Sequence, residues 1–142
     1  MLTVSDILKN KDNKIFSVLP SHSVYEAIKL MGEKNIGVVL VIENGELKGI
    51  LSERDYARKI VLKDRRSRDT MVSEIMTEKL VTVSPGDSVE HCMNTMTAKK
   101  IRHLPVIENG ELAGIVSIGD VVMTIIQMQE ETIHHLQNYI TQ

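Results

Sequence analysis

The chain has 142 residues, of which 17 are basic and 19 acidic, and this is the size and charge balance of an ordinary soluble domain. Hydrophobic residues make up 42% of the chain and only three residues are proline, so the composition excludes a disordered chain. The longest uncharged apolar run, residues 36–42, is far shorter than the roughly 18 residues that cross a bilayer, and residues 1–10 lack the pattern of a signal peptide. We therefore expect a cytoplasmic protein without membrane association.

The side-chain inventory also excludes several classes of ligand. A sequence pI near 6.2 disfavours a nucleic-acid partner, because such domains carry an excess of Lys and Arg. The single cysteine, Cys92, forms no internal disulfide and no thiolate cage for a metal. His134 and His135 are adjacent and so point about 100° apart on a helix, and His22 and His91 have no partner at ligand spacing. We predict no bound metal.

The chain contains an internal repeat. The hexapeptide Ile-Glu-Asn-Gly-Glu-Leu begins at Ile42 and recurs 65 residues later at Ile107. In the same register, the motif Gly-Ile-x-Ser-x-x-Asp begins at Gly49 and again at Gly114. Such self-similarity indicates one structural unit written twice.

The two copies differ in how they begin. Residues 4–8 resemble residues 72–76 at an offset of 68, so the connection before the first strand differs in length by three residues. Residues 63–70 are too polar for a core and are interpreted as the linker. We predict a first repeat over residues 1–66 and a second over residues 67–142.

Each copy begins with a predicted strand and a predicted helix. Residues 15–18 and 80–83 are short β-prone runs, each closed two residues later by a proline. Ser23 and Ser88 stand where an N-cap is expected, ahead of apolar residues at helical spacing. These are Val24, Ala27, Ile28 and Met31 in the first copy and Val89, Cys92, Met93 and Met96 in the second. Because Cys92 aligns with Ala27, we interpret it as a small core residue, and a redox role stays open as the alternative.

Each copy continues with a predicted hairpin and a second helix. An Asn-Gly pair lies between the apolar runs 38–42 and 47–51, and another between 104–107 and 112–116, which predicts type I′ turns. Ser52 and Ser117 are predicted to cap the last helix of each copy, the second of which runs on toward Tyr139. That helix is more apolar than one module requires, which predicts a homodimer. The apolar residues are Val121, Val122, Ile125, Ile126, Met128 and Ile133.

The paired Gly-Ile-x-Ser-x-x-Asp motifs, with Ile-Arg-His-Leu-Pro-Val beginning at Ile101, resemble the cystathionine-β-synthase (CBS) domain family over nearly the whole chain. The resemblance implies a mixed α/β (α+β) fold of tandem repeats, each strand-helix-strand-strand-helix, packed about a pseudo-twofold axis, with a long C-terminal helix. It also implies a Bateman module that binds adenine nucleotides in clefts between the repeats and regulates a partner protein.

The residues suggest the same ligand on physical grounds. Asp55 and Asp120 can each accept from both hydroxyls of a ribose. Ser52 and Ser117 open helices, whose N-termini favour phosphate, and the motif glycines leave space for a close approach. The alternative is that Ser-x-x-Asp is a plain N-cap worth ~1 kcal/mol, and the sequence leaves both interpretations open.

Further residues complete the predicted nucleotide site. Aliphatic side chains line a slot for adenine, with backbone groups at Gly37 and His103 reading the base edge. Arg54 and Arg102, with His103, are predicted to hold phosphate, although Arg54 could instead form a salt bridge with an acidic neighbour. The full set is Val18, Ile36, Gly37, Val38, Ser52, Arg54, Asp55, Thr82, Val83, Ile101, Arg102, His103, Leu104, Pro105, Ser117 and Asp120.

Two functions remain open at this point. The first is a non-enzymatic sensor that binds AMP, ATP or NAD(H) and transmits occupancy to a separate partner enzyme. The alternative is a ligand-free dimeric scaffold for such an enzyme, including one in a thioredoxin-type redox system. An enzyme is disfavoured, since the sequence shows no nucleophile with an evident base, no Walker loop and no catalytic cofactor motif. The unequal charges of the two copies leave open whether one or both clefts are occupied.

Overall fold

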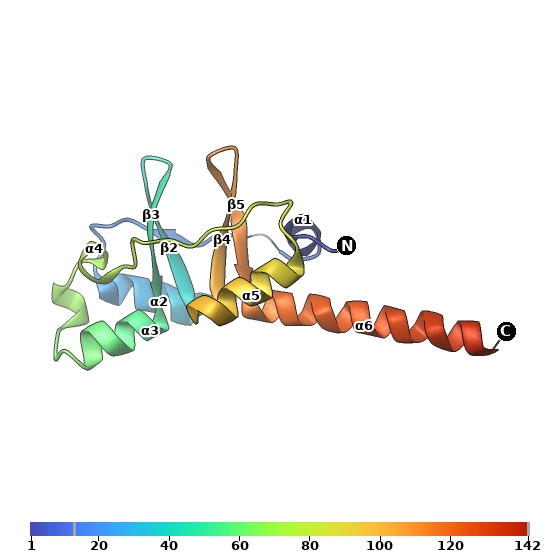
Figure 1. Cartoon of the computed structure of the whole chain (residues 1–142). Coiled ribbons are helices and arrows are strands. Elements are labelled where there is room, and N and C mark those ends of the chain that lie inside the picture. Colours follow the sequence, from blue (N-terminus) through green and yellow to red (C-terminus); the bar gives the residue numbers. More distant parts are fainter. Residues whose placement is uncertain (13, 142) are drawn as a thin grey trace. The chain divides into compact units, whose positions relative to one another are not determined.

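The computed structural model describes residues 1–12 and 14–141 and confirms a mixed α+β fold (Figure 1). The elements in chain order are α1 (Val4–Lys9), β1 (Ser17–Val18), α2 (Val24–Lys34), β2 (Val38–Glu43), β3 (Glu46–Ser52), α3 (Glu53–Tyr56), a π-helical turn (Ala57–Val61), a 3-10 turn (Ser67–Asp69), α4 (Val72–Ile75), α5 (Val89–Lys99), β4 (His103–Glu108), β5 (Glu111–Ser117) and α6 (Ile118–Thr141).

The chain forms two compact units that exchange their entry helices. The Asp55 unit is Lys14–Val81, and the Asp120 unit holds the described residues before Lys14 and after Val81. Helix α1 belongs to the Asp120 unit, where the N–H of Val4 donates to the carbonyl of Asp87 at 2.9 Å. Helix α4 belongs to the Asp55 unit, where the N–H of Val72 donates to the carbonyl of His22 at 2.8 Å. Each unit therefore takes its entry helix from the other sequence repeat, whose boundaries stay a prediction.

The first strand is shorter than predicted in both copies. In the Asp55 unit, β1 pairs in parallel with β2, and the N–H of Leu40 donates to the carbonyl of Phe16 at 3.1 Å. In the Asp120 unit, the predicted strand over residues 80–83 is reduced to a single bridge between Val83 and Val106. The reason is Pro105, which stands where the first copy has Leu40 and has no N–H to extend the ladder.

Both hairpins form as predicted. β2 pairs antiparallel with β3, and β4 pairs antiparallel with β5. The turn residues have positive φ, 54° at Asn44 and 76° at Gly45, and 51° at Asn109 and 79° at Gly110. Two successive residues of positive φ define the type I′ turn, and this confirms the sequence prediction.

The first helix of each copy is capped as predicted. Ser23 Oγ accepts from the N–H of Glu26 at 3.1 Å, and Ser88 Oγ accepts from the N–H of His91 at 2.9 Å. The aligned residues Ala27 and Cys92 are both fully buried, so the core role of the cysteine is confirmed. Burial raises the pKa of the Cys92 thiol, which keeps it protonated.

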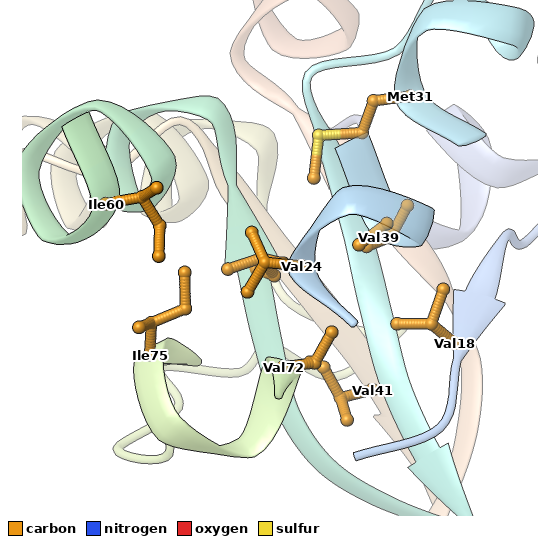
Figure 2. Packing of buried hydrophobic residues seen from close by; sticks show 10 residues of the cluster. Val18, Val24, Met31, Val39, Val41, Ile60, Val72 and Ile75 are labelled. Carbon is orange, nitrogen blue, oxygen red and sulfur yellow. The ribbon is translucent and has the colours of Figure 1, made fainter. Parts of the chain in front are cut away.

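Figure 2 shows how α4 completes the core of the Asp55 unit. Val72 of α4 lies beside Val24 of α2 and Val41 of β2, and all three side chains are fully buried. Ile75, one turn further along α4, faces Ile60 of the π-helical turn. An entry helix of only four residues contributes this much because both of its apolar side chains point inward.

Exchange of the entry helices makes a matched pair of variants informative. Ile7 of α1 and Ile75 of α4 are each almost fully buried, so Ile7→Ala and Ile75→Ala should each lower the free energy of unfolding by about 2–5 kcal/mol. Hydrogen exchange should quicken in residues 103–117 for Ile7→Ala and in residues 38–52 for Ile75→Ala. Leu62→Ala, at an exposed position, is the control. Faster hydrogen exchange in residues 38–52 for Ile7→Ala and in residues 103–117 for Ile75→Ala would contradict the exchange of the entry helices between the units.

Candidate functional site

The first candidate group lies where β5 ends and α6 begins. The N–H of Asp120 donates to Ser117 Oγ at 3.1 Å, and Asp120 Oδ2 accepts from the N–H of Ser117 at 2.9 Å. The Asp120 side chain is 22% exposed. The Ser-x-x-Asp motif therefore forms a reciprocal cap that holds a carboxylate in place at a helix N-terminus.

The same group recurs where β3 ends and α3 begins. The N–H of Asp55 donates to Ser52 Oγ at 3.1 Å, and Asp55 Oδ2 accepts from the N–H of Ser52 at 3.0 Å. The capping role considered from the sequence is thus present in both copies. It uses Oδ2 of each carboxylate and leaves Oδ1 to face another partner.

Strand register brings other predicted residues to each capped turn. In the Asp120 unit, His103 pairs with Ser117, and the N–H of Ile118 donates to the carbonyl of Arg102 at 2.8 Å. Arg102, His103, Ser117 and Asp120 therefore gather at one end of a hairpin.

The equivalent residues of the Asp55 unit gather in the same way, since Val38 pairs with Ser52. The N–H of Glu53 donates to the carbonyl of Gly37 at 3.0 Å. The backbone position equivalent to Gly37 is thus Arg102 and not His103, and its carbonyl already accepts one hydrogen bond.

Lys11, which the sequence did not identify as a site residue, contacts Asp120. Its Nζ lies 2.7 Å from Asp120 Oδ2 and donates to the carbonyl of Ile115 at 3.0 Å. Lys11 follows α1, so the contact depends on the exchanged entry helix, and the repeat register gave no signal of it. Burial alone would raise the pKa of Asp120, but hydrogen bonds from Lys11 and Ser117 outweigh burial and lower it.

The carboxylate of the Asp55 unit is held differently. Lys59 Nζ lies 3.1 Å from Asp55 Oδ1 and also donates to the carbonyl of Ile75 at 2.8 Å. Thr77, which follows α4, donates from its hydroxyl to Asp55 Oδ1 at 3.3 Å. The charge partner of Asp55 thus comes from its own helical segment, whereas that of Asp120 comes from an entry segment. Arg54 is exposed.

His103 supplies no charge at neutral pH. Burial lowers its pKa, and Lys11 and Arg102 lower it further, while Asp120 opposes the shift. The ring is therefore a neutral hydrogen-bonding group. Positive charge near Asp120 comes from Lys11 and from Arg102, which is exposed.

Part of the predicted adenine slot lies in the hydrophobic core. Val18, Val38, Val83 and Leu104 of the slot are buried, as is the predicted site residue Pro105. Contact of these side chains with a ligand stays a prediction, and their burial does not favour it. The slot members with accessible surface are Ile36 and Ile101, and the predicted site residue Thr82 is exposed.

The prediction that Gly49 leaves space for a ligand is wrong. A Cβ at Gly49 would lie 2.8 Å from Met76 Sδ and 2.9 Å from the carbonyl oxygen of Thr77. The chain itself makes the close approach, because the segment after α4 pairs with β3 through Ile50 and Thr77. Glycine is needed at this position for packing.

In the part of the chain that the structure describes, no helix is both long and apolar enough to span a bilayer. Within the same residues, no three His, Cys, Asp or Glu side chains gather in a way that could hold a metal ion.

The lowered pKa of Asp120 predicts a pH effect. A carboxyl with a lowered folded-state pKa contributes stability that is full above its usual value of 3.8 and is lost as the pH falls through the folded-state pKa. Lys11→Met removes the charge while keeping most of the chain length, so it should raise the pKa of Asp120. Carboxyl carbon NMR titration measures this shift. Lys59→Met is the control and should leave Asp120 unchanged; an unmoved Asp120 pKa in Lys11→Met would refute the ion pair.

Comparison with known proteins places these features in a family. The family model described as "CBS domain" matches residues 4–62 and 72–127. The mitochondrial CBS domain-containing protein CBSX3 of Arabidopsis thaliana is 42% identical over 147 residues, covering 97% of this chain and 71% of the relative. A solved structure, a putative signal-transduction protein with CBS domains from Burkholderia ambifaria, is 48% identical with a TM-score of 0.86, covering 88% of this chain and 94% of that one.

A more distant structure shares the fold. The CBS domain pair of protein MJ0100, in complex with 5′-methylthioadenosine and S-adenosyl-L-methionine, has a TM-score of 0.78 at 23% identity. The match covers 90% of this chain and 98% of that one. Two family matches in one chain, the two capped Ser-x-x-Asp turns and these close relatives lead to one conclusion: the chain belongs to the CBS domain family and carries a pair of CBS domains.

Proposed function

We propose that this CBS domain pair is a non-enzymatic sensor that binds an adenosine-containing nucleotide of the AMP, ATP or NAD(H) class and transmits its occupancy to a separate partner protein. One observation carries the proposal. Each unit holds a largely buried carboxylate, Asp55 or Asp120, at a capped helix N-terminus beside the start of a strand. The coarser statement, that CBS pairs are regulatory and ligand-binding modules, follows from the family.

The chemistry of the Asp120 unit fits such a ligand. The capping contacts of Asp120 use Oδ2, so Oδ1 is positioned to accept from ribose hydroxyls. Lys11 and Arg102 provide the positive charge that a phosphate requires, and the N-terminus of α6 adds its dipole. The neutral His103 ring can hydrogen bond to the ligand. The other predicted site residues complete the proposed contact set.

The comparisons support the class of ligand and the regulatory role. MJ0100 binds two adenosyl compounds on the same fold, and the Burkholderia relative is described as a signal-transduction protein. A conformational signal requires that the ligand bind two shapes of the protein with different affinity. Lys11 is suited to this, because a phosphate that binds its ammonium competes with the ion pair between Lys11 and Asp120.

The proposal includes a homodimer as the functional form of the protein, on the basis of the exposed apolar residues of α6. The proposal also places the protein in the cytoplasm. The Arabidopsis relative, in contrast, is mitochondrial by name.

Titration with AMP, ATP, NAD, NADH and S-adenosylmethionine tests the proposal, by calorimetry and by thermal unfolding. At least one nucleotide should raise the unfolding midpoint. Asp120→Asn keeps an oxygen for the cap but loses the charge, so it should weaken binding by about 10- to 100-fold if the Asp120 unit is occupied. Asp55→Asn makes the same test of the other unit.

Glu111→Gln, at the exposed first residue of β5 in the Asp120 unit, is the matched control and should bind as the unmodified protein does. Binding that is unchanged in both aspartate variants would contradict the assigned carboxylates. No binding of any of these compounds at millimolar concentration would contradict the sensor.

A second candidate function is a ligand-free scaffold for a separate enzyme. It is favoured by the observation that both carboxylates already have partners within their own units, Lys11 for Asp120 and Lys59 with Thr77 for Asp55. The nucleotide titration distinguishes the two functions. A scaffold binds its partner equally well with and without nucleotide, and its partner binding is unchanged by Asp120→Asn and Asp55→Asn.

A further inference from the structure

The second half of α6 is exposed to solvent throughout. Val121, near the start of the helix, is fully buried, but every described residue from Ile126 to Thr141 is exposed. Figure 1 shows this part of α6 extending past the other elements of the Asp120 unit. An isolated helix of this length is only marginally stable in water, so one that is also apolar requires a partner.

The exposed apolar residues form a regular seam. We define the α6 seam as the residues spaced alternately four and three apart along the exposed part of the helix, which are Val122, Ile126, Gln129, Ile133, Leu136 and Ile140. Its apolar members are between 39% and 79% exposed. A four-three spacing sustained over this length is the heptad pattern of a coiled coil, and a helix with one such seam matches a second copy of itself.

From this seam we propose that two copies of the chain associate through α6 in a parallel, two-stranded coiled coil. The inference rests on the proposed homodimer and names its surface. In heptad terms the a positions are Ile126, Ile133 and Ile140, and Leu136 is a d position. β-branched residues at a with leucine at d favour two parallel strands.

Gln129 selects the parallel orientation. It occupies the d position in the middle of the seam, so parallel helices place Gln129 opposite Gln129 of the second copy, where the two amides hydrogen bond to each other. Antiparallel helices in the best overlap would place Gln129 opposite Ile133, leaving a buried amide without a partner. In other coiled coils a single polar Asn or Lys at an a position sets the register, and the proposal gives Gln129 the same role at d.

Charge leads to the same orientation. Glu130 flanks the seam at an e position, and α6 contains no Lys or Arg. Parallel helices place Glu130 beside Ile125 of the other copy, which involves no like charges. Antiparallel helices would place the two copies of Glu130 beside each other, and like charges at that distance repel.

The surface is large enough for a stable pair. With the flanking Met123 and Tyr139, the two seams together would bury on the order of 1,000 Å², which is the lower range of specific protein interfaces. Among the residues that the structure describes, the apolar members of the seam all keep a large exposed fraction, so this face of α6 is available to a second copy.

Oligomeric state tests the interface. The full chain should sediment as a dimer at micromolar concentration, and Ile133→Lys should raise the dimer dissociation constant by more than about 30-fold, because it places two ammonium groups in the seam. Gln127→Lys makes a similar change on the outer face and should remain dimeric. Circular dichroism and the nucleotide titration show that each variant is folded.

A cysteine variant tests the orientation. Leu136→Cys in a Cys92→Ala background, mildly oxidised with glutathione disulfide, should form a covalent dimer, because facing d positions of parallel helices lie within disulfide range. In the antiparallel pairing the two introduced thiols would lie ~15 Å apart along the axis and would not join. Alanine at position 92 matches Ala27 of the other repeat.

The outcomes are separable. A dimer that survives Ile133→Lys overturns the α6 interface and leaves the homodimer standing. A dimer in which Leu136→Cys forms no crosslink overturns the parallel orientation. A monomeric full chain overturns both the homodimer and the coiled coil, as would be seen if α6 instead served a different protein, whereas loss of nucleotide binding alone leaves this inference untouched.

Discussion

The insertion of each entry helix into the core built by the other repeat is the constraint on which the rest of the structure depends. Val4 of α1 and Val72 of α4 are fully buried, and each is fixed by a backbone hydrogen bond to its host unit. A unit of about 65 residues has little apolar area to bury, so two more buried side chains are a substantial part of its core. The two units are covalently interleaved as a result, since the entry helix of each is supplied by the sequence repeat that builds the other.

The same exchange sets the chemistry of the candidate sites. The residues that follow each entry helix reach the capped carboxylate of the host unit, Lys11 at Asp120 and Thr77 at Asp55. The entry segment therefore supplies an ammonium group to Asp120 and a hydroxyl group to Asp55, although the two capping turns are alike. Any movement of an entry segment changes the partners of its carboxylate, so the candidate site is coupled to the packing of the unit.

Helix α6 connects the site to the outside of its unit. Its first turn holds Asp120, the next residue, Val121, is fully buried, and its far half exposes the α6 seam. A helix is stiff over this length, so a change at the first turn is carried to the seam as a movement of the whole rod. If the proposed nucleotide binds at Asp120 and the proposed dimer forms through the α6 seam, this helix provides the physical route between them.

The sequence by itself determined the local structure. The two Asn-Gly turns, the caps at Ser23 and Ser88, the reciprocal caps at Ser52 and Ser117 and the duplicated order of elements all follow from residues close together in the chain, whose backbone preferences act over a few positions. The family follows from the same motifs.

Tertiary structure alone decided the features that depend on contacts between residues far apart in the chain. The proline at position 105 shortened a predicted strand only because β4 lies beside Val83, and the space expected at Gly49 is filled by Met76 from a different segment. Lys11 reaches Asp120 across more than a hundred residues because the entry helices are exchanged. The register of a repeat records which residues are equivalent, but it carries no information on which copy each segment packs against, because that is decided by the burial of apolar side chains in a shared core.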